Sequence, residues 1–392
     1  MVANFNTVAK PGGNRCNLAC RYCFYLENEV PRPGYAAMDD RTLEAYIHNT
    51  ILSTPSESVE FCWQGGEPTL CGLSFFEKVV TLQQRYRGNK TISNSLQTNG
   101  VLLNDKWARF LHRHGFLVGL SIDGPAALHD TWRTTRGGKP SWEKVVQAIR
   151  CLQRHDVPLN AMVVVSRPSE NEGKNLYRCL SRELNLRHLQ FIPLVAPPHA
   201  WSVTSDGWGK FLRSVFDDWL ENDVGKVFIQ FFDNLLGVWS GQPATLCTMQ
   251  PVCGQSLLVE QNGDVYSCDH FVSPAYKLGN LTQDSMAAMA SSPFQQQFGQ
   301  QKAQLSARCQ VCHWRFACHG GCPKHRILTH DDEAQNFLCS GYLTFFHHIT
   351  PYMNVMRRLL LNGQPPALIM SLIPEIREHI IKLTESENER AE

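Results

Sequence analysis

The sequence lacks long apolar runs, an excess of charge of either sign and low-complexity tracts. No apolar stretch among its 392 residues approaches the roughly 18 residues that a membrane-spanning helix needs. The start, residues 1–10, has no apolar segment before a small-residue cleavage site, so we expect no signal peptide. The 37 Lys and Arg residues balance 36 Asp and Glu residues, and no basic cluster suggests nucleic-acid binding. We therefore expect a cytoplasmic protein with neither a membrane nor a nucleic acid as partner.

Cysteine, in contrast, is abundant, with 15 residues. An odd number of cysteines in a reducing compartment argues against disulfides and favours metal or redox chemistry. Three of them, Cys16, Cys20 and Cys23, form a C-x3-C-x2-C triplet. A second set comprises Cys247, Cys253, Cys268, Cys309, Cys312, Cys318, Cys322 and Cys339. We interpret the remaining Cys62, Cys71, Cys151 and Cys179 as small hydrophobic residues outside any site.

Alternating strand and helix patterns predict an α/β fold with a parallel sheet in residues 1–200. Apolar, β-branched runs indicate strands, and amphipathic stretches between them indicate helices. The expected strands are 59–63, 116–122, 161–165 and 188–192, and the expected helices include one opened by Asp39-Asp40, 73–87 and 142–154. After residue 198 two helical stretches, 211–220 and 227–239, precede a hairpin that turns at Asn262-Gly263.

The cysteine triplet supplies three thiolates in a loop after the first strand. A [4Fe–4S] cube held by three protein ligands keeps one iron open to another molecule. Structural zinc prefers four ligands, and His48 could supply the fourth. Similarly, Cys309, Cys312, Cys318 and Cys322 could make one closed zinc site. The spacings by themselves leave iron–sulfur clusters and zinc as alternatives.

The segment Cys16–Cys23 resembles the CxxxCxΦC signature of the radical S-adenosylmethionine (SAM) superfamily, with Tyr22 as the aromatic residue. Residues 65–68, Gly-Gly-Glu-Pro, resemble its GGEP motif, although a Gly-Gly turn is also common after a strand. The resemblance implies a partial (β/α)6 TIM-like barrel and a cluster that splits bound SAM into methionine and a 5′-deoxyadenosyl radical. The SAM contacts that it implies are Tyr22, Gly65, Gly66, Glu67, Gln97, Ser121, Arg133 and Val195, with Arg133 at the SAM carboxylate.

The second cysteine set resembles the SPASM extension of peptide-modifying radical SAM enzymes, which carries two further [4Fe–4S] clusters. By that resemblance auxiliary cluster I is held by Cys247, Cys253, Cys268 and Cys322, and auxiliary cluster II by Cys309, Cys312, Cys318 and Cys339. The implied domains are a barrel with linking helices at 1–240, a SPASM domain at 241–346, and a C-terminal helical segment with a charged tail at 347–392.

Within the superfamily the chain looks most like the anaerobic sulfatase-maturating enzymes, from residue 10 to about residue 346. Segments 64–70, 95–100, 116–121 and 265–269 carry this resemblance. It implies oxidation of a Cys or Ser, in a CxPxR- or SxPxR-type stretch of an unfolded or nascent sulfatase, to Cα-formylglycine. A flavodoxin or ferredoxin is the implied electron donor. Asp269 is the implied base, and Gln64 and Tyr25 are the implied substrate contacts.

Two alternatives remain. One is another SPASM peptide maturase that forms thioether or carbon–carbon crosslinks. Such enzymes often carry a peptide-recruiting domain before the first cluster, and Cys16 lies too close to Met1 for one. The other is a zinc-stabilised binding protein without chemistry, which metal analysis would separate from the enzymes.

Overall fold

The computed structural model describes residues 5–23, 25, 37–197, 199–328 and 334–389. The chain folds into two compact units. The first consists of Met1–Met162 and Val252–Gln304, and the second of Val163–Pro251 and Leu305–Glu392. The chain therefore passes from one unit to the other three times.

The first unit contains a mostly parallel sheet. Its parallel neighbours, in order, are β8 (Ser256–Glu260), β1 (Asn6–Lys10), β2 (Ser58–Trp63), β3 (Thr91–Thr98), β4 (Leu117–Ser121) and the first part of β5 (Leu159–Val165), up to Met162. Beyond β8 the antiparallel strands β9 (Asp264–Tyr266) and β10 (Lys277–Asn280) extend the sheet. Since the inner strands pair in parallel, their carboxyl ends lie along one edge.

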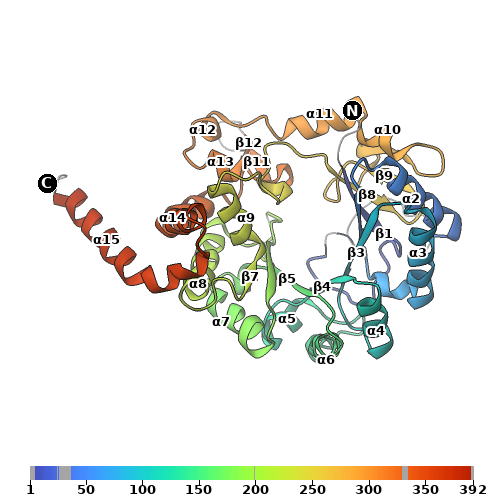
Figure 1. Ribbon diagram of the computed structural model, residues 1–392, viewed down its shortest axis with the longest axis horizontal. Helices are drawn as coiled ribbons and strands as arrows, with labels where there is room; N and C mark the ends of the chain where they lie inside the picture. Colours follow the sequence, from blue (N-terminus) through green and yellow to red (C-terminus); the bar gives the residue numbers. More distant parts are fainter. Residues whose placement is uncertain (1–4, 24, 26–36, 198, 329–333, 390–392) are drawn as a thin grey trace. The chain divides into compact units, whose positions relative to one another are not determined.

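Helices α2 (Asp40–Ser53), α3 (Leu73–Tyr86), α4 (Asp105–Arg113), α5 (Ala126–Trp132) and α6 (Trp142–Arg154) connect these strands. Figure 1 shows α2 and α3 side by side against the strands β1 to β3. The Asp39 carboxylate accepts a hydrogen bond from the Thr42 backbone N–H and so caps α2 at its first turn. The rings of Tyr46, Phe61, Trp63 and Phe76 pack against one another between the helices and the sheet. Two further helices, α10 (Met286–Ala290) and α11 (Pro293–Gln301), complete the unit.

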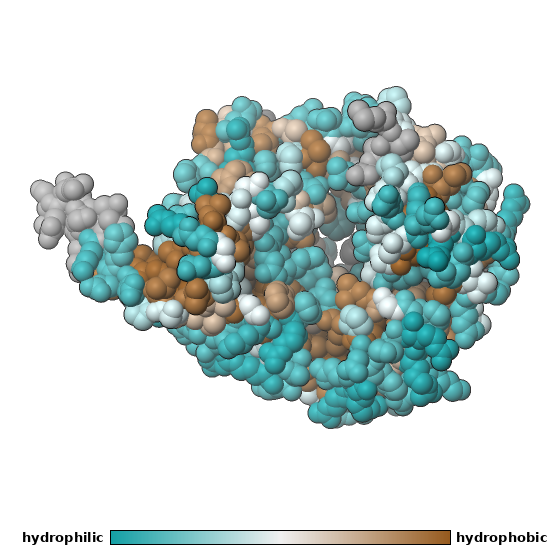
Figure 2. Space-filling view, in the orientation of Figure 1, coloured by the Kyte–Doolittle hydropathy of each residue, from teal (hydrophilic) through white to brown (hydrophobic). Residues whose placement is uncertain are grey.

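The second unit is mainly helical. Its elements are α7 (Gly173–Arg178), β6 (His188–Pro193), α8 (Ser205–Asn222), β7 (Phe228–Ile229), α9 (Gln230–Trp239), α12 (Ala307–Gln310), α13 (Arg315–Cys318), β11 (Arg326–Leu328), β12 (Ala334–Asn336), α14 (Cys339–Leu361) and α15 (Ile369–Glu389). The rings of Phe216, Phe232 and Phe345 join α8, α9 and α14 in its core. Exposed apolar side chains accompany the end of α14 and α15 (Figure 2), among them Leu361 and Ile381.

The α/β fold class predicted from the sequence is confirmed, with β1 to β6 alternating with helices. The four expected strands form, and the hairpin turns at Asn262-Gly263, where Gly263 has a φ of 83°. The prediction of helix throughout 227–239 is wrong at its start, because Phe228 and Ile229 pair with β6 as strand β7 before α9 begins. Among the described residues no helix is both long and apolar enough to span a bilayer. The predicted domain boundaries stay a prediction.

Candidate active site and metal centres

Polar side chains gather where the parallel strands of the first unit end. Lys10 ends β1, Gln64 follows β2, Gln97 stands near the end of β3, Ser121 ends β4, and Glu260 ends β8. This carboxyl edge is where parallel βα units place their ligand sites. Three of the five, Gln64, Gln97 and Ser121, are residues for which the sequence predicted binding roles, so the fold brings them to one edge.

The cysteine triplet lies in the loop that follows β1. Burial raises the pKa of Cys16 to about 12 and also raises the pKa of Cys20. The charges of the neighbouring cysteines push both values further up, so the three thiols lie within electrostatic reach of one another. Cys16 Sγ already accepts a hydrogen bond from the Leu18 backbone N–H at 3.4 Å. Partly buried thiols of this kind become thiolates when a metal centre replaces their protons.

Among the described residues, Asp105, Cys151 and His155 form the only set of three or more metal-ligand side chains whose ligand atoms all lie within 4.8 Å. The sulfurs of Cys16, Cys20 and Cys23 do not all lie within that distance of one another. The choice between an iron–sulfur cluster and zinc therefore rests on the family to which the chain belongs.

The Gly-Gly-Glu segment is built against the cysteine loop. The Gly66 N–H donates to the Gly13 carbonyl and the Glu67 N–H to the Arg15 carbonyl, at 2.8 and 2.7 Å. A Cβ on Gly66 would lie 2.0 Å from the Arg15 carbonyl oxygen, so only glycine allows this approach. Gly66 is therefore required for packing against the cysteine loop, whether or not a ligand is bound.

Glu67 is a fully buried carboxylate that ties two strand ends together. It accepts hydrogen bonds from Thr69 after β2, and from Thr98 and the Asn99 N–H at the end of β3. Burial raises the pKa of Glu67, against the opposing effect of these hydrogen bonds. The side chain thus shapes the predicted SAM site by holding its loops; a direct SAM contact of Glu67 remains a prediction.

Arg133 and Tyr22 share one buried carboxylate, that of Asp123. Arg133 Nε and Nη2 donate to the two oxygens of Asp123 at 2.7 and 3.1 Å, and the Tyr22 hydroxyl donates to Oδ2 at 2.5 Å. Burial alone would raise the pKa of Asp123, but the Arg133 charge and these hydrogen bonds outweigh it and lower the pKa. Arg133 and Tyr22 were predicted from the sequence as SAM contacts. No role was predicted for Asp123, which lies in the turn after β4. A role of Arg133 at a SAM carboxylate stays a prediction.

A second ion pair joins the end of β1 to the turn after β9. Lys10, 2% exposed, forms an ion pair with Asp269, and its Nζ lies 3.7 Å from the centre of the Tyr25 ring. The Tyr25 hydroxyl donates to Glu260 at 2.8 and 3.0 Å. Lys10 and Glu260 are register partners in the parallel pair β1–β8. The structure thus joins the predicted Asp269 and Tyr25 to two charged residues that the sequence analysis missed.

The four cysteines assigned to auxiliary cluster II all lie in the second unit. Cys309 lies on α12, Cys312 follows it, Cys318 ends α13, and Cys339 begins α14. Burial raises the pKa of Cys318 to about 12, and the charges of the other three raise it further. After Cys318 the chain turns sharply through a left-handed residue, His319, with a φ of 46°. The structure therefore brings this predicted ligand set together.

The cysteines assigned to auxiliary cluster I are divided between the two units. Cys253 and Cys268 belong to the first, and Cys247 and Cys322 to the second. Val195, a predicted SAM contact, is half-buried and follows β6 in the second unit. These assignments stay predictions.

Comparison with known proteins gives a consistent result. Residues 11–180 match the radical SAM superfamily, and residues 247–313 match an iron–sulfur cluster-binding domain, SPASM. A serine-type anaerobic sulfatase-maturating enzyme of Bacteroides thetaiotaomicron is 42% identical, over 94% of this chain and 95% of its own length. A cysteine-type enzyme of Clostridium perfringens is 33% identical, over 87% and 95%. The chain belongs to the anaerobic sulfatase-maturating enzymes.

A solved member of this family, native anSMEcpe with bound AdoMet and Cp18Cys peptide, superposes with a TM-score of 0.84 at 32% identity, covering 91% of this chain and 99% of that one. The present sulfatase-maturating enzyme is therefore a radical SAM oxidoreductase that uses SAM and three [4Fe–4S] clusters. The zinc-stabilised binding protein considered from the sequence is excluded.

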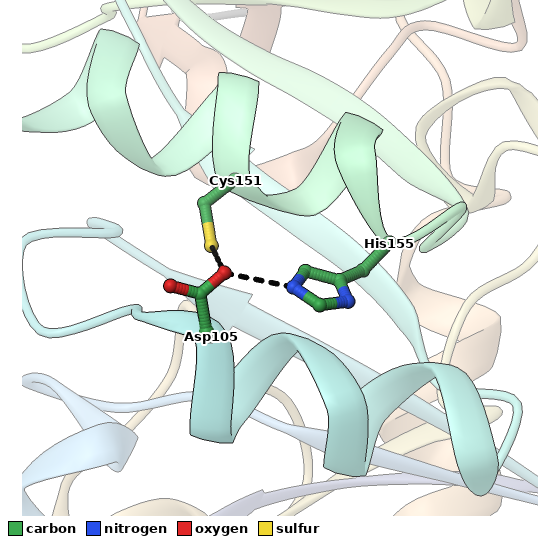
Figure 3. Close-up of side chains that lie close together, drawn as sticks. All are labelled: Asp105, Cys151 and His155. Atoms are coloured by element: carbon green, nitrogen blue, oxygen red, sulfur yellow. Dashed lines mark hydrogen bonds and ion pairs between the residues drawn. The ribbon is translucent and has the colours of Figure 1, made fainter.

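The compact Asp105–Cys151–His155 group of this maturating enzyme, on α4 and α6, has a structural explanation (Figure 3). Asp105 Oδ1 accepts hydrogen bonds from His155 Nε2 at 2.8 Å, Arg154 Nη2 at 3.3 Å and Cys151 Sγ at 3.6 Å. The hydrogen bond from His155 is the main cause that lowers the pKa of Asp105, while burial raises that of Cys151. Asp105 lies in the first turn of α4, and Arg154 lies in the last turn of α6, so each charge is favourable to the dipole of its helix. The hydrogen bonds of Asp105 therefore join the start of α4 to the end of α6.

Proposed function

We propose that this enzyme oxidises a Cys or Ser side chain, within a CxPxR- or SxPxR-type stretch of an unfolded or nascent sulfatase, to Cα-formylglycine. The observation that carries the proposal is the similarity to sulfatase-maturating enzymes of both types over nearly the whole chain. A match at 42% identity that leaves almost no segment of either chain uncovered argues for shared chemistry as well as a shared fold.

The oxidation removes one hydrogen atom, one proton and one electron from the substrate residue. A serine thereby becomes the aldehyde directly, whereas a cysteine becomes a thioaldehyde, from which water releases hydrogen sulfide to give the aldehyde. When bound, SAM and the first cluster supply the radical that takes the hydrogen atom from Cβ. We assign Cys16, Cys20 and Cys23 to that cluster. Tyr22, Gly65, Gly66, Gln97, Ser121, Arg133 and Val195 are proposed to hold SAM, and Glu67 is proposed to shape its loop and contact it.

Asp269 is the proposed acceptor of the thiol or hydroxyl proton. It directly follows Cys268, so a proton and an electron would leave the substrate at neighbouring positions. Its side chain is 26% exposed, whereas Asp123, the other ion-paired aspartate at this edge, is 3% exposed. Gln64 and Tyr25 are the proposed contacts of the substrate peptide.

The auxiliary clusters receive the substrate's electron in this proposal. Cys247, Cys253, Cys268 and Cys322 are the proposed ligands of cluster I, and Cys309, Cys312, Cys318 and Cys339 those of cluster II. A reduced flavodoxin or ferredoxin in the cytoplasm is the proposed electron donor to the first cluster.

Anaerobic turnover of matched Cys and Ser peptides, followed by mass spectrometry, tests the proposal. The reconstituted enzyme, with SAM and a reductant, is expected to convert at least one peptide to the aldehyde, with 5′-deoxyadenosine and methionine as co-products. Deoxyadenosine without aldehyde on either peptide would contradict it. A crosslinked product would instead favour the peptide maturases that form thioether or carbon–carbon bonds.

A further inference from the structure

Lys10 is a charged residue for which neither the fold nor the proposed chemistry yet accounts. It is the last residue of β1, and its side chain is 2% exposed. Burying an ammonium group costs several kcal/mol unless a partner compensates for the lost hydration. A methionine or leucine would fill the same space without that cost, so the retained charge points to a role beyond packing.

The partners of Lys10 show what its charge acts on. Its Nζ forms an ion pair with Asp269 and lies against the face of Tyr25 at 3.7 Å from the ring centre. Tyr25 is in turn fixed through its hydroxyl, which donates to both oxygens of Glu260. Glu260 ends β8 opposite Lys10, so the two strand ends position all three side chains.

Asp269 itself lies outside the helices and strands, in the turn after β9 in which the Phe271 N–H donates to the Cys268 carbonyl. A proton acceptor must be held within a few tenths of an ångström of its productive position. A carboxylate in a loop does not meet that requirement unless a neighbour fixes it. Lys10, on a central strand of the sheet, provides a rigid point from which to do so.

We propose that Lys10 is the positioning residue of Asp269: its ammonium, seated on the Tyr25 ring, fixes the carboxylate that takes the substrate proton. The inference rests on the proposed function and adds a residue to it. Lys10 acts through Asp269 and does not itself contact the substrate.

The test compares Lys10→Met and Lys10→Arg with the wild-type holoenzyme. The readouts are formylglycine formed per 5′-deoxyadenosine, and KM and kcat for the peptide. In Lys10→Met the ratio is expected to fall at least tenfold through kcat, with KM and SAM cleavage within about threefold of wild type. Lys10→Arg, which keeps the cation, is expected to recover at least half of the wild-type ratio. An unchanged ratio in Lys10→Met, or equal losses in both variants, would overturn the proposal.

A double variant separates positioning from direct contact. Adding Lys10→Met to Asp269→Asn is expected to lower the ratio no further, since the group on which Lys10 acts is already gone. A further loss of tenfold would place Lys10 at the substrate and contradict the proposal. If Lys10→Met fails to retain its iron, Lys10→Gln, which keeps a polar donor of shorter reach, takes its place with the same expected loss. The wild-type enzyme tests the proposed function separately. If it forms no formylglycine, the proposed function is refuted. If it forms formylglycine and the Lys10 variant has an unchanged ratio, only the role of Lys10 is refuted.

Discussion

The first unit contains two ion pairs that have a similar arrangement and differ in the exposure of their aspartates. In each pair a cation lies over a tyrosine ring: Arg133 is 5.4 Å from the centre of Tyr22, and Lys10 is 3.7 Å from that of Tyr25. Each pairs with an aspartate, Asp123 or Asp269. The aspartates differ in exposure, because the Asp123 side chain is 3% exposed and that of Asp269 is 26% exposed.

Arginine in one pair and lysine in the other suit the two aspartates to different roles. The planar guanidinium of Arg133 binds both oxygens of Asp123, and the Tyr22 hydroxyl adds a third hydrogen bond. Such a bidentate pair fixes geometry and occupies the carboxylate. Lysine is a point charge that holds a carboxylate without covering both oxygens. The first pair therefore suits holding a loop at the proposed SAM site, and the second suits a carboxylate with the proposed role of proton acceptor.

Asp269→Asn should have the largest effect on formylglycine formation. Asparagine keeps the shape and cannot take the proton, so formylglycine formation should fall about 10²- to 10⁴-fold. SAM cleavage should remain within a few-fold of wild type, because the SAM contacts are untouched. Mass spectrometry of the peptide and chromatography of deoxyadenosine measure both rates. Product at the normal rate would show that Asp269 is not the base.

Asp123→Asn should act on stability instead. It leaves the Arg133 charge buried without its partner, which costs about 3–5 kcal/mol of unfolding free energy. Anaerobic thermal unfolding of the loaded enzyme measures this cost. The exposed Asp105→Asn is the matched control and should leave the melting temperature nearly unchanged. Equal effects of the two substitutions would contradict the assignment of Asp123 to a buried structural pair.

The loop that carries Arg133 should also make stability depend on pH, through His129. Burial, followed by the Arg133 charge, lowers the pKa of His129 to about 4 from an unfolded value of 6.5. Its Nδ1 accepts from the Asp123 N–H at 3.2 Å, and Nε2 faces Ser141 Oγ at 2.9 Å, as a neutral ring requires. A lowered pKa gives stability that is complete above pH 6.5 and is lost as pH falls toward 4. The loss should reach at most about 3 kcal/mol, and His129→Gln should flatten that part of the unfolding profile. If His129→Gln shows the same pH dependence of the unfolding free energy as the wild type, His129 is not the cause of that dependence.

The tyrosine hydroxyls should give the smallest effects. Tyr22→Phe and Tyr25→Phe each remove a hydrogen bond to a carboxylate, worth about 2 kcal/mol, and keep the ring beneath the cation. Both variants should lose stability in unfolding experiments and keep the wild-type ratio of formylglycine to deoxyadenosine. A large change of ratio in Tyr25→Phe would mean that the hydroxyl, not the ring, supports Lys10.

Local pattern predicted most of the fold and part of the site. Apolar periodicity located β2, β4, β5 and β6, and Asn262-Gly263 located the hairpin, because these features depend on neighbouring residues. Cysteine spacing, together with the family resemblance, indicated the cluster ligands, and these assignments stay predictions. Lys10 and Glu260 were missed because their meeting depends on the register between β1 and β8, whose sequences lie some 250 residues apart. A charged residue directly after two or three apolar strand residues was the available signal for both.

Strand β7 and Asp123 show two further limits. Phe228 and Ile229 continue a helical apolar pattern, yet β6 offers them a strand partner, and tertiary pairing outweighs local preference. Asp123 looks like an ordinary turn residue in the sequence. Its importance comes from Arg133 and Tyr22, which reach it from separate segments.

The most direct test of the account places both aspartates in one assay. The measured quantity is formylglycine formed per 5′-deoxyadenosine during anaerobic turnover, in iron-replete Asp269→Asn and Asp123→Asn enzymes. The account predicts a ratio at least a hundredfold below wild type for Asp269→Asn. For Asp123→Asn it predicts a ratio within about threefold of wild type, since SAM cleavage and product should fall together. An unchanged ratio in Asp269→Asn, or an equally large decrease of the ratio in both variants, would contradict the proposal that the Asp123 pair is structural and that Asp269 accepts the proton.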